Sequence, residues 1–120
     1  MENFGRENGN YKLKWVAIIL ALTFIFGCAS PAKKACLKTD WRKLGYDEGV
    51  RGEQADSNLT LRRNCRSEGV TPDMRRYDQG RRQGIEKYCS VKSGRAIGIE
   101  GSPYQGVCPP DLEASFKTAY

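Results

Sequence analysis

The chain has no histidine among its 120 residues, and this absence excludes much familiar enzyme chemistry. A Ser-His or Cys-His nucleophile and a histidine-bearing metal site are both ruled out. The five cysteines include no Cys-x-x-Cys pair, the spacing typical of zinc sites and of thioredoxin-like centres. Carboxylates could still pair for acid–base work, but helix capping and pairing with arginine account for them better. We expect no enzyme, no metal and no cofactor.

The sequence also lacks an apolar run long enough to cross a bilayer, which takes about 20 residues. Its longest run, from Trp15 to Phe26, has 12 residues and follows two lysines, as in a signal peptide. The run ends in Ile25-Phe26-Gly27-Cys28, which resembles the bacterial lipobox, although Phe26 stands where a small residue is usual. We expect residues 1–27 to be a lipoprotein signal peptide and Cys28 to carry the lipid. An uncleaved signal anchor is the alternative.

The residue after the lipobox cysteine indicates whether the inner or the outer membrane holds the protein. By analogy with bacterial lipoproteins, aspartate there favours the inner membrane, so Ala29 favours the outer membrane, with the domain facing the periplasm. Residues 28–35 are expected to be a lipidated tether, extended over up to about 23 Å. Residues 36–120 then form one domain, anchored to the membrane through the lipid.

Four cysteines remain once Cys28 is assigned to lipid, and an even number in an oxidising compartment predicts two disulfides. Three pairings of Cys36, Cys65, Cys89 and Cys108 are possible. If the two long predicted helices run antiparallel, Cys36 lies beside Cys89, which leaves Cys65 for Cys108. The other two connectivities stay open.

Periodicity predicts an all-α, disulfide-stapled domain of three to four helices. Asp40 can cap a first helix from Trp41, and Thr71, before Pro72, can cap a second. A short basic helix is expected over 59–68 and a last one from Pro110, whereas the glycine-rich residues 93–107 are expected to be a loop, with Gly94 ending the second helix.

The two long predicted helices share an unusual glycine content. Tyr46-Asp47-Glu48-Gly49 recurs 31 positions later as Tyr77-Asp78-Gln79-Gly80. Each helical glycine costs about 1 kcal/mol relative to alanine, so close approach of the two helices is the natural reason for them.

Opposite charges fall on the two faces that should meet. Rotation by about 100° per residue places Glu48 between Gly45 and Gly52, and Arg81 between Tyr77 and Gly84. An unpaired buried charge costs several kcal/mol, so we expect a structural Glu48–Arg81 ion pair at the contact. The alternative is an exposed Arg81 that grips an anionic ligand.

The net charge of +6 indicates which classes of partner the protein could bind. Residues 28–120 carry nearly all of it, which suits anionic lipid or wall polymer, or docking on another envelope protein, and the envelope address argues against nucleic acid. We expect a binding or structural component of the envelope. The cations proposed for an anionic ligand are Arg62, Arg63, Arg66, Arg75, Arg76, Arg82, Lys87, Lys92 and Arg95.

Spaced residues over most of the mature chain resemble a known family. They are Trp41-x3-Gly45-Tyr46-x2-Gly49-x2-Gly52, Tyr77-x2-Gly80-Arg81-x2-Gly84-x3-Tyr88-Cys89 and Tyr104-x-Gly106-Val107-Cys108-Pro109. The order is similar to that of small Gram-negative lipoproteins known only as a domain of unknown function. The resemblance implies an envelope address and supplies no catalytic residues.

Overall fold

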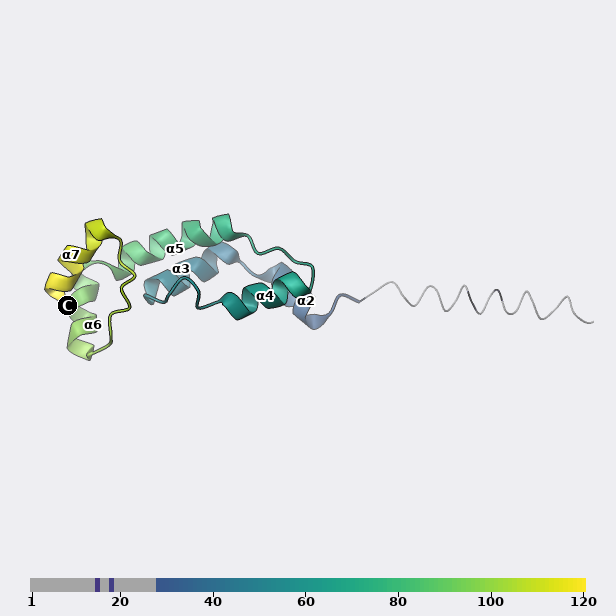
Figure 1. The fold of residues 1–120 in the computed structure, drawn as a ribbon, viewed down its shortest axis with the longest axis horizontal. Helices are drawn as coiled ribbons and strands as arrows, with labels where there is room; N and C mark the ends of the chain where they lie inside the picture. Colours follow the sequence, from purple (N-terminus) through teal and green to yellow (C-terminus); the bar gives the residue numbers. More distant parts are fainter. Residues whose placement is uncertain (1–14, 16–17, 19–27) are drawn as a thin grey trace, which may run out of the picture.

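The computed structural model of the protein describes Trp15, Ile18 and residues 28–120. The predicted signal peptide, residues 1–27, therefore lies outside the described residues except for those two positions. Residues 28–120 form an all-α domain without strands, as predicted, although with six helices rather than three to four (Figure 1). They are α2 (Pro31–Lys38), α3 (Trp41–Val50), α4 (Leu59–Ser67), α5 (Met74–Tyr88), α6 (Val91–Glu100) and α7 (Pro110–Ala119). Among the described residues, no helix has the length and apolarity that a membrane span requires.

Side chains that accept backbone N–H groups fix where the helices begin. The Asp40 carboxylate accepts from the N–H groups of Arg42 and Lys43 at 3.1 Å and starts α3, as predicted. Asp73 starts α5 by accepting from Arg76 at 3.1 Å. The predicted Thr71 cap is thus wrong. A helix capped by Thr71 would begin at Pro72, whereas α5 begins at Met74.

Helix α6 replaces most of the predicted loop. Ser90 caps it, and Gly101, with a φ of 70°, ends it. Gly94 does not end a helix but lies buried inside one, where a Cβ would stand 2.7 Å from the carbonyl oxygen of Phe116. The glycines of this segment therefore permit close packing of α6 against α7, which the sequence pattern alone does not distinguish from a loop.

Helices α3 and α5 pack with their backbones in contact (Figure 1). A Cβ on Gly45 would lie 2.1 Å from the Tyr77 carbonyl oxygen, and a Cβ on Gly80 would lie 1.8 Å from that of Arg42. One turn further along, the same relation holds for a second pair of glycines, Gly49 and Gly84. The close approach predicted from the glycines is thus confirmed. The glycines that hold equivalent places in the two helices, Gly45 with Gly80 and Gly49 with Gly84, are 35 positions apart, whereas the sequence repeat has a spacing of 31.

The α3–α5 pair is parallel, because residues early in one helix meet residues early in the other. This overturns the predicted antiparallel arrangement and the disulfide pairing derived from it. The bonds are Cys36–Cys65 and Cys89–Cys108, with Cα separations of 5.5 and 5.6 Å. In a parallel pair the segment before α3 lies near the start of α5, so Cys36 and Cys89 stand at opposite ends of the domain.

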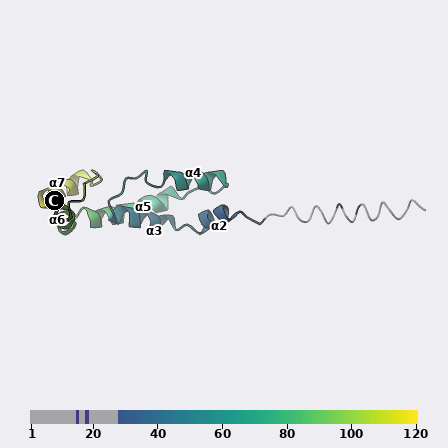
Figure 2. The same cartoon turned by 90° about the horizontal axis from the view of Figure 1, so that it is seen from below.

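Each disulfide belongs to its own apolar cluster. One cluster packs Trp41 and Tyr77 around Cys36–Cys65, and the other packs Ile85, Tyr88 and Phe116 around Cys89–Cys108. Figures 1 and 2 show α2 at one end of the domain and α6 with α7 at the other. Helices α3 and α5 connect these two small cores.

The substitution Gly80→Ala tests the backbone contact. Its Cβ would meet a backbone carbonyl, which cannot rotate away, so we expect a loss of about 3 kcal/mol in the free energy of unfolding. Gly69→Ala is the control: its φ is 74° with nothing within 4 Å, so only backbone strain of about 1 kcal/mol is expected. Urea unfolding of the oxidised protein measures both, and equal losses would contradict the contact.

Candidate functional site

A buried carboxylate lies where α3, α5 and the segment before α4 meet. Glu48 is only 4% exposed. It accepts a 2.6 Å hydrogen bond from the Tyr77 hydroxyl, and both its oxygens accept from the Asn58 amide at 2.9 and 3.1 Å. Buried polar groups need such partners, and the two side chains that hydrogen-bond to this carboxylate are both neutral.

The predicted Glu48–Arg81 ion pair is wrong. Arg81 instead donates to the backbone carbonyl of Glu53, on the segment that follows α3. Glu48 is buried on the predicted face, but Tyr77, one turn before Arg81 on α5, supplies the donor. Asn58 could not be predicted as a partner of Glu48, because it lies outside both helices. Only the path of the segment between α3 and α4 brings its amide to Glu48.

The same cluster perturbs a tyrosine. Burial and the hydrogen bond to Glu48 raise the pKa of the Tyr77 hydroxyl above its ordinary value of 10.0, and the Arg81 guanidinium opposes this shift. The Arg62 guanidinium lies over the Tyr77 ring, 4.7 Å from its centroid. Arg62 also donates a 2.8 Å hydrogen bond to the Ala55 carbonyl, so its side chain is half-buried against the domain.

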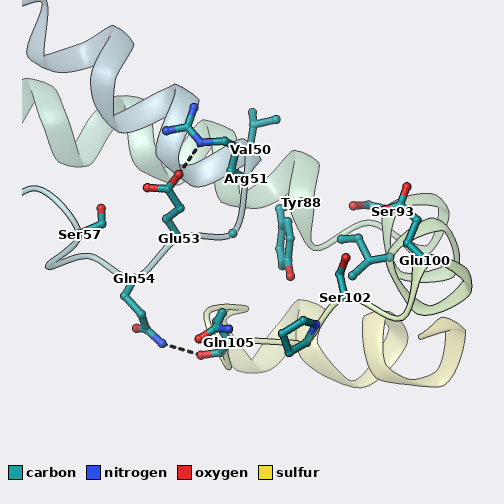
Figure 3. A pocket seen from close by; sticks show the side chains of 13 residues that line it. Val50, Arg51, Glu53, Gln54, Ser57, Tyr88, Ser93, Glu100, Ser102 and Gln105 are labelled. Carbon is teal, nitrogen blue, oxygen red and sulfur yellow. Dashed lines mark hydrogen bonds and ion pairs between the residues drawn. The ribbon is translucent and has the colours of Figure 1, made fainter.

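A second feature is an open groove of about 780 Å³ at the other end of the domain (Figure 3). The end of α3 and the turn after it form one wall, and α6 with the segment after it forms the other. The Gln54 amide donates to the Gln105 carbonyl at 2.7 Å and bridges the two walls. The polar lining residues are Arg51, Glu53, Gln54, Ser57, Tyr88, Ser93, Glu100, Ser102 and Gln105.

Tyr88 is the unusual member of this groove. Its side chain is only 6% exposed and its ring stacks on Phe116, with centroids 5.3 Å apart. The Tyr88 hydroxyl lines the groove and has no hydrogen-bond partner among residues 28–120, whereas the buried Tyr77 hydroxyl has one. Burial raises the pKa of Tyr88, so this hydroxyl stays protonated and able to donate.

The charges in the groove nearly cancel. Arg51 forms an ion pair with Glu53, and Glu100 adds one further carboxylate. None of the nine cations that the sequence suggested for an anionic ligand lines the groove. Its chemistry is that of amides, hydroxyls and an aromatic ring, which suits an uncharged polar ligand better than an anion.

The predicted cationic surface is divided. Arg63 and Arg66 are exposed on α4 and Arg75 and Arg76 at the start of α5, whereas Lys87, Lys92 and Arg95 lie toward α6. Arg63, Arg66, Arg75 and Arg76 thus lie toward the end of the domain that holds α2.

Cys28 is exposed and is the free cysteine of the described residues. The tether expected after it is mostly helical, since α2 begins at Pro31, where proline suits the first turn of a helix. Ser30 caps α2 and also donates a hydrogen bond to Glu68 after α4. Within residues 28–120, only Cys28 and Ala29 precede the folded domain, so the extended tether of about 23 Å expected over residues 28–35 is wrong.

Comparison with known proteins assigns the chain to a family. Residues 40–120 match the model of a family described as a protein of unknown function, DUF2799. The match covers more than half of the chain, so the protein belongs to this family, and the predicted resemblance to a domain of unknown function is confirmed. No curated protein and no solved structure matches the chain.

The substitution Tyr77→Phe tests the buried cluster. It removes a donor from a buried carboxylate, so we expect a loss of about 1–3 kcal/mol in stability at neutral pH, against under about 0.5 for the exposed Tyr46→Phe. Because the folded pKa of Tyr77 is raised, its contribution is complete below pH 10.0 and is lost as the pH rises through the folded value. Urea unfolding from pH 7 to 11 should show wild type and Tyr77→Phe converging; a constant gap would contradict the prediction.

Proposed function

We propose that the protein is an exported lipoprotein, acylated on Cys28 and anchored in the outer membrane. Its helical domain faces the periplasm and acts as a binding or structural component of the cell envelope, without catalysing a reaction. The observation that carries this proposal is the exposed, unpaired Cys28, which ends a lipobox-like sequence and is separated from α2 by Ala29 and Ser30.

The remaining cysteines support an extracytoplasmic address. All four are paired, and disulfides persist in oxidising compartments such as the periplasm. A domain of this size has room for only a modest core, so such cross-links are a common means of stabilising it. A free cysteine beside two formed disulfides is unusual for an exported protein unless it has a separate use, and acylation is that use.

The groove at the α6 end of the domain is the candidate ligand site of the proposed envelope component. Its near-neutral, hydroxyl-rich and amide-rich lining, with the unpartnered Tyr88 hydroxyl at its base, favours an uncharged oligosaccharide. Sugar hydroxyls match amides and carboxylates, and the apolar face of a sugar ring matches aliphatic side chains such as Ile97. In the envelope, the amide-bearing glycan of the wall has this chemistry.

Binding of anionic lipid or wall polymer through arginine is the second candidate. The exposed Arg63, Arg66, Arg75 and Arg76 favour it, since guanidinium groups match phosphate geometry. This surface lies apart from the groove, so the two candidates can be tested separately.

The substitution Cys28→Ser tests the anchor. It should abolish metabolic labelling with palmitate and leave an unprocessed precursor, because the thiol is the only group that the lipid can modify there. Ala29→Asp is the matched control: labelling should persist, while the protein moves from the outer to the inner membrane fraction. Labelling of the serine variant would contradict the assignment of Cys28.

The substitution Tyr88→Phe tests the groove. Isothermal titration with the tetramer of N-acetylglucosamine should show binding to the wild type and about tenfold weaker binding to Tyr88→Phe, the loss expected for one hydrogen bond. The hydroxyl has no partner within residues 28–120, so stability should change by less than about 0.5 kcal/mol. Tyr46→Phe, outside the groove, should bind like the wild type. Absence of wild-type binding, or equal binding by Tyr88→Phe, would refute the glycan site.

A further inference from the structure

The outward face of α2 is apolar and cationic at once. Leu37 is 64% exposed, and Lys34, three residues before it on the same side of the helix, is exposed as well. Lys38, also exposed, lies one turn after Lys34 and borders the same face. The helix contains three lysines and no acidic residue. Cys36, on the opposite side, forms the disulfide to α4, so the disulfide fixes which face of α2 is turned away from the domain.

The position of Cys28 limits how far this face can be from lipid. Ser30 is already held by its bond to Glu68, so two Cα steps separate the acylated residue from the fixed domain, a reach of about 7 Å. The end of the domain that carries α2 must then rest at the headgroup level. Both views of the fold place α2 at that end, with α6 and α7 far from it (Figures 1 and 2).

We propose that the Leu37, Lys34 and Lys38 face of α2 docks on the anionic phospholipid surface beside the anchor. This inference rests on the proposed acylation of Cys28. Leu37 enters the boundary between headgroups and acyl chains, and the two lysines extend along the surface toward lipid phosphates, as side chains of interfacial helices do. The stapled α4 adds the exposed Arg63 and Arg66 to the same end of the domain.

This docking gives the lipid anchor a second attachment. One acyl chain binds reversibly, and stable attachment takes an additional acyl chain or a basic patch. A lipoprotein with several acyl chains is already held, so the α2 face would serve mainly to orient the domain. The groove then lies at the end directed away from the bilayer, toward the interior of the periplasm.

The depth of Leu37 can be measured on the acylated mature product, residues 28–120, which lacks Trp15. The variants Leu37→Trp and Ile99→Trp are matched, because Ile99 is 81% exposed and lies on α6 at the far end. Each is reconstituted in vesicles of phosphatidylethanolamine and phosphatidylglycerol with brominated acyl chains, and the wild-type emission of the buried Trp41 is subtracted. We expect the Leu37→Trp emission to fall by roughly half, since such residues insert about 5–10 Å, and that of Ile99→Trp to be unchanged.

Substitutions that remove charge test whether Lys34 and Lys38 contribute to the docking. Adding Lys34→Gln and Lys38→Gln to Leu37→Trp should reduce the quenching to the value seen in vesicles of zwitterionic phosphatidylcholine. Adding Lys87→Gln and Lys92→Gln, both exposed at the other end, should leave it unchanged. Equal effects of the two lysine pairs would refute a docking face on α2.

Flotation and mass measurement separate the two proposals. A protein that floats with the vesicles and carries acyl chains, but whose Leu37→Trp emission is not quenched, retains the proposed function and overturns the docking face. A protein without acyl chains that does not float overturns the proposed anchor, and the docking face is overturned with it. Quenching of both tryptophans would also overturn the proposal, since the domain would then have no fixed orientation.

Discussion

The contact between the backbones of α3 and α5 determines the rest of the structure. Four glycines let carbonyl oxygens of each helix approach positions where any side chain would collide. The two glycine pairs, four residues apart in each helix, form a small-residue stripe of the kind that brings helices close together. Because the pair is parallel, the chain must return from the end of α3 to the start of α5. The segment that makes this return carries Asn58 and α4, and so supplies both a partner for Glu48 and the cysteine that binds α2.

The same constraint explains the two disulfides. A contact made of glycine backbone buries little apolar side chain, so the central pair alone provides no large core. The apolar side chains gather instead at the two ends of the pair, and each cluster contains one disulfide. Closing loops of this size stabilises the folded state by about 3 kcal/mol each in the chain-entropy view. Cys36–Cys65 attaches α2, which has a single buried residue, and Cys89–Cys108 joins the end of α5 to the segment before α7.

Local features of the fold could be predicted from the sequence, and relative directions could not. The Asp40 cap, the glycine contact face and the burial of Glu48 follow from residue type and helical rotation. Helical rotation, however, is the same for parallel and antiparallel partners, so it gave no means of choosing between the pairings of Cys36. Glycine is equally ambiguous: Gly94 matches a helix end as well as a close contact, and only the packing of α7 decides between them. The Asn58–Glu48 bond depends on a non-helical segment, for which periodicity makes no prediction. Tyr88 belongs to the spaced residues that carry the family resemblance, but the spacing does not show that its ring is buried while its hydroxyl lies at the groove.

The position of the first disulfide has a mechanical consequence for an anchored protein. If Cys28 carries the proposed lipid, any force between lipid and domain passes through Ala29 and Ser30 into α2, which is a short helix with one buried residue, Cys36. Noncovalent contacts of so small a helix would yield readily, but Cys36–Cys65 carries the load directly into α4. Reduction of this bond would leave the anchor attached to a helix that can detach, while Cys89–Cys108 and the groove at the other end would stay intact. The two disulfides thus lie at separate places in the fold: one joins α2, beside the proposed attachment, to α4, and the other joins segments at the end that carries the groove.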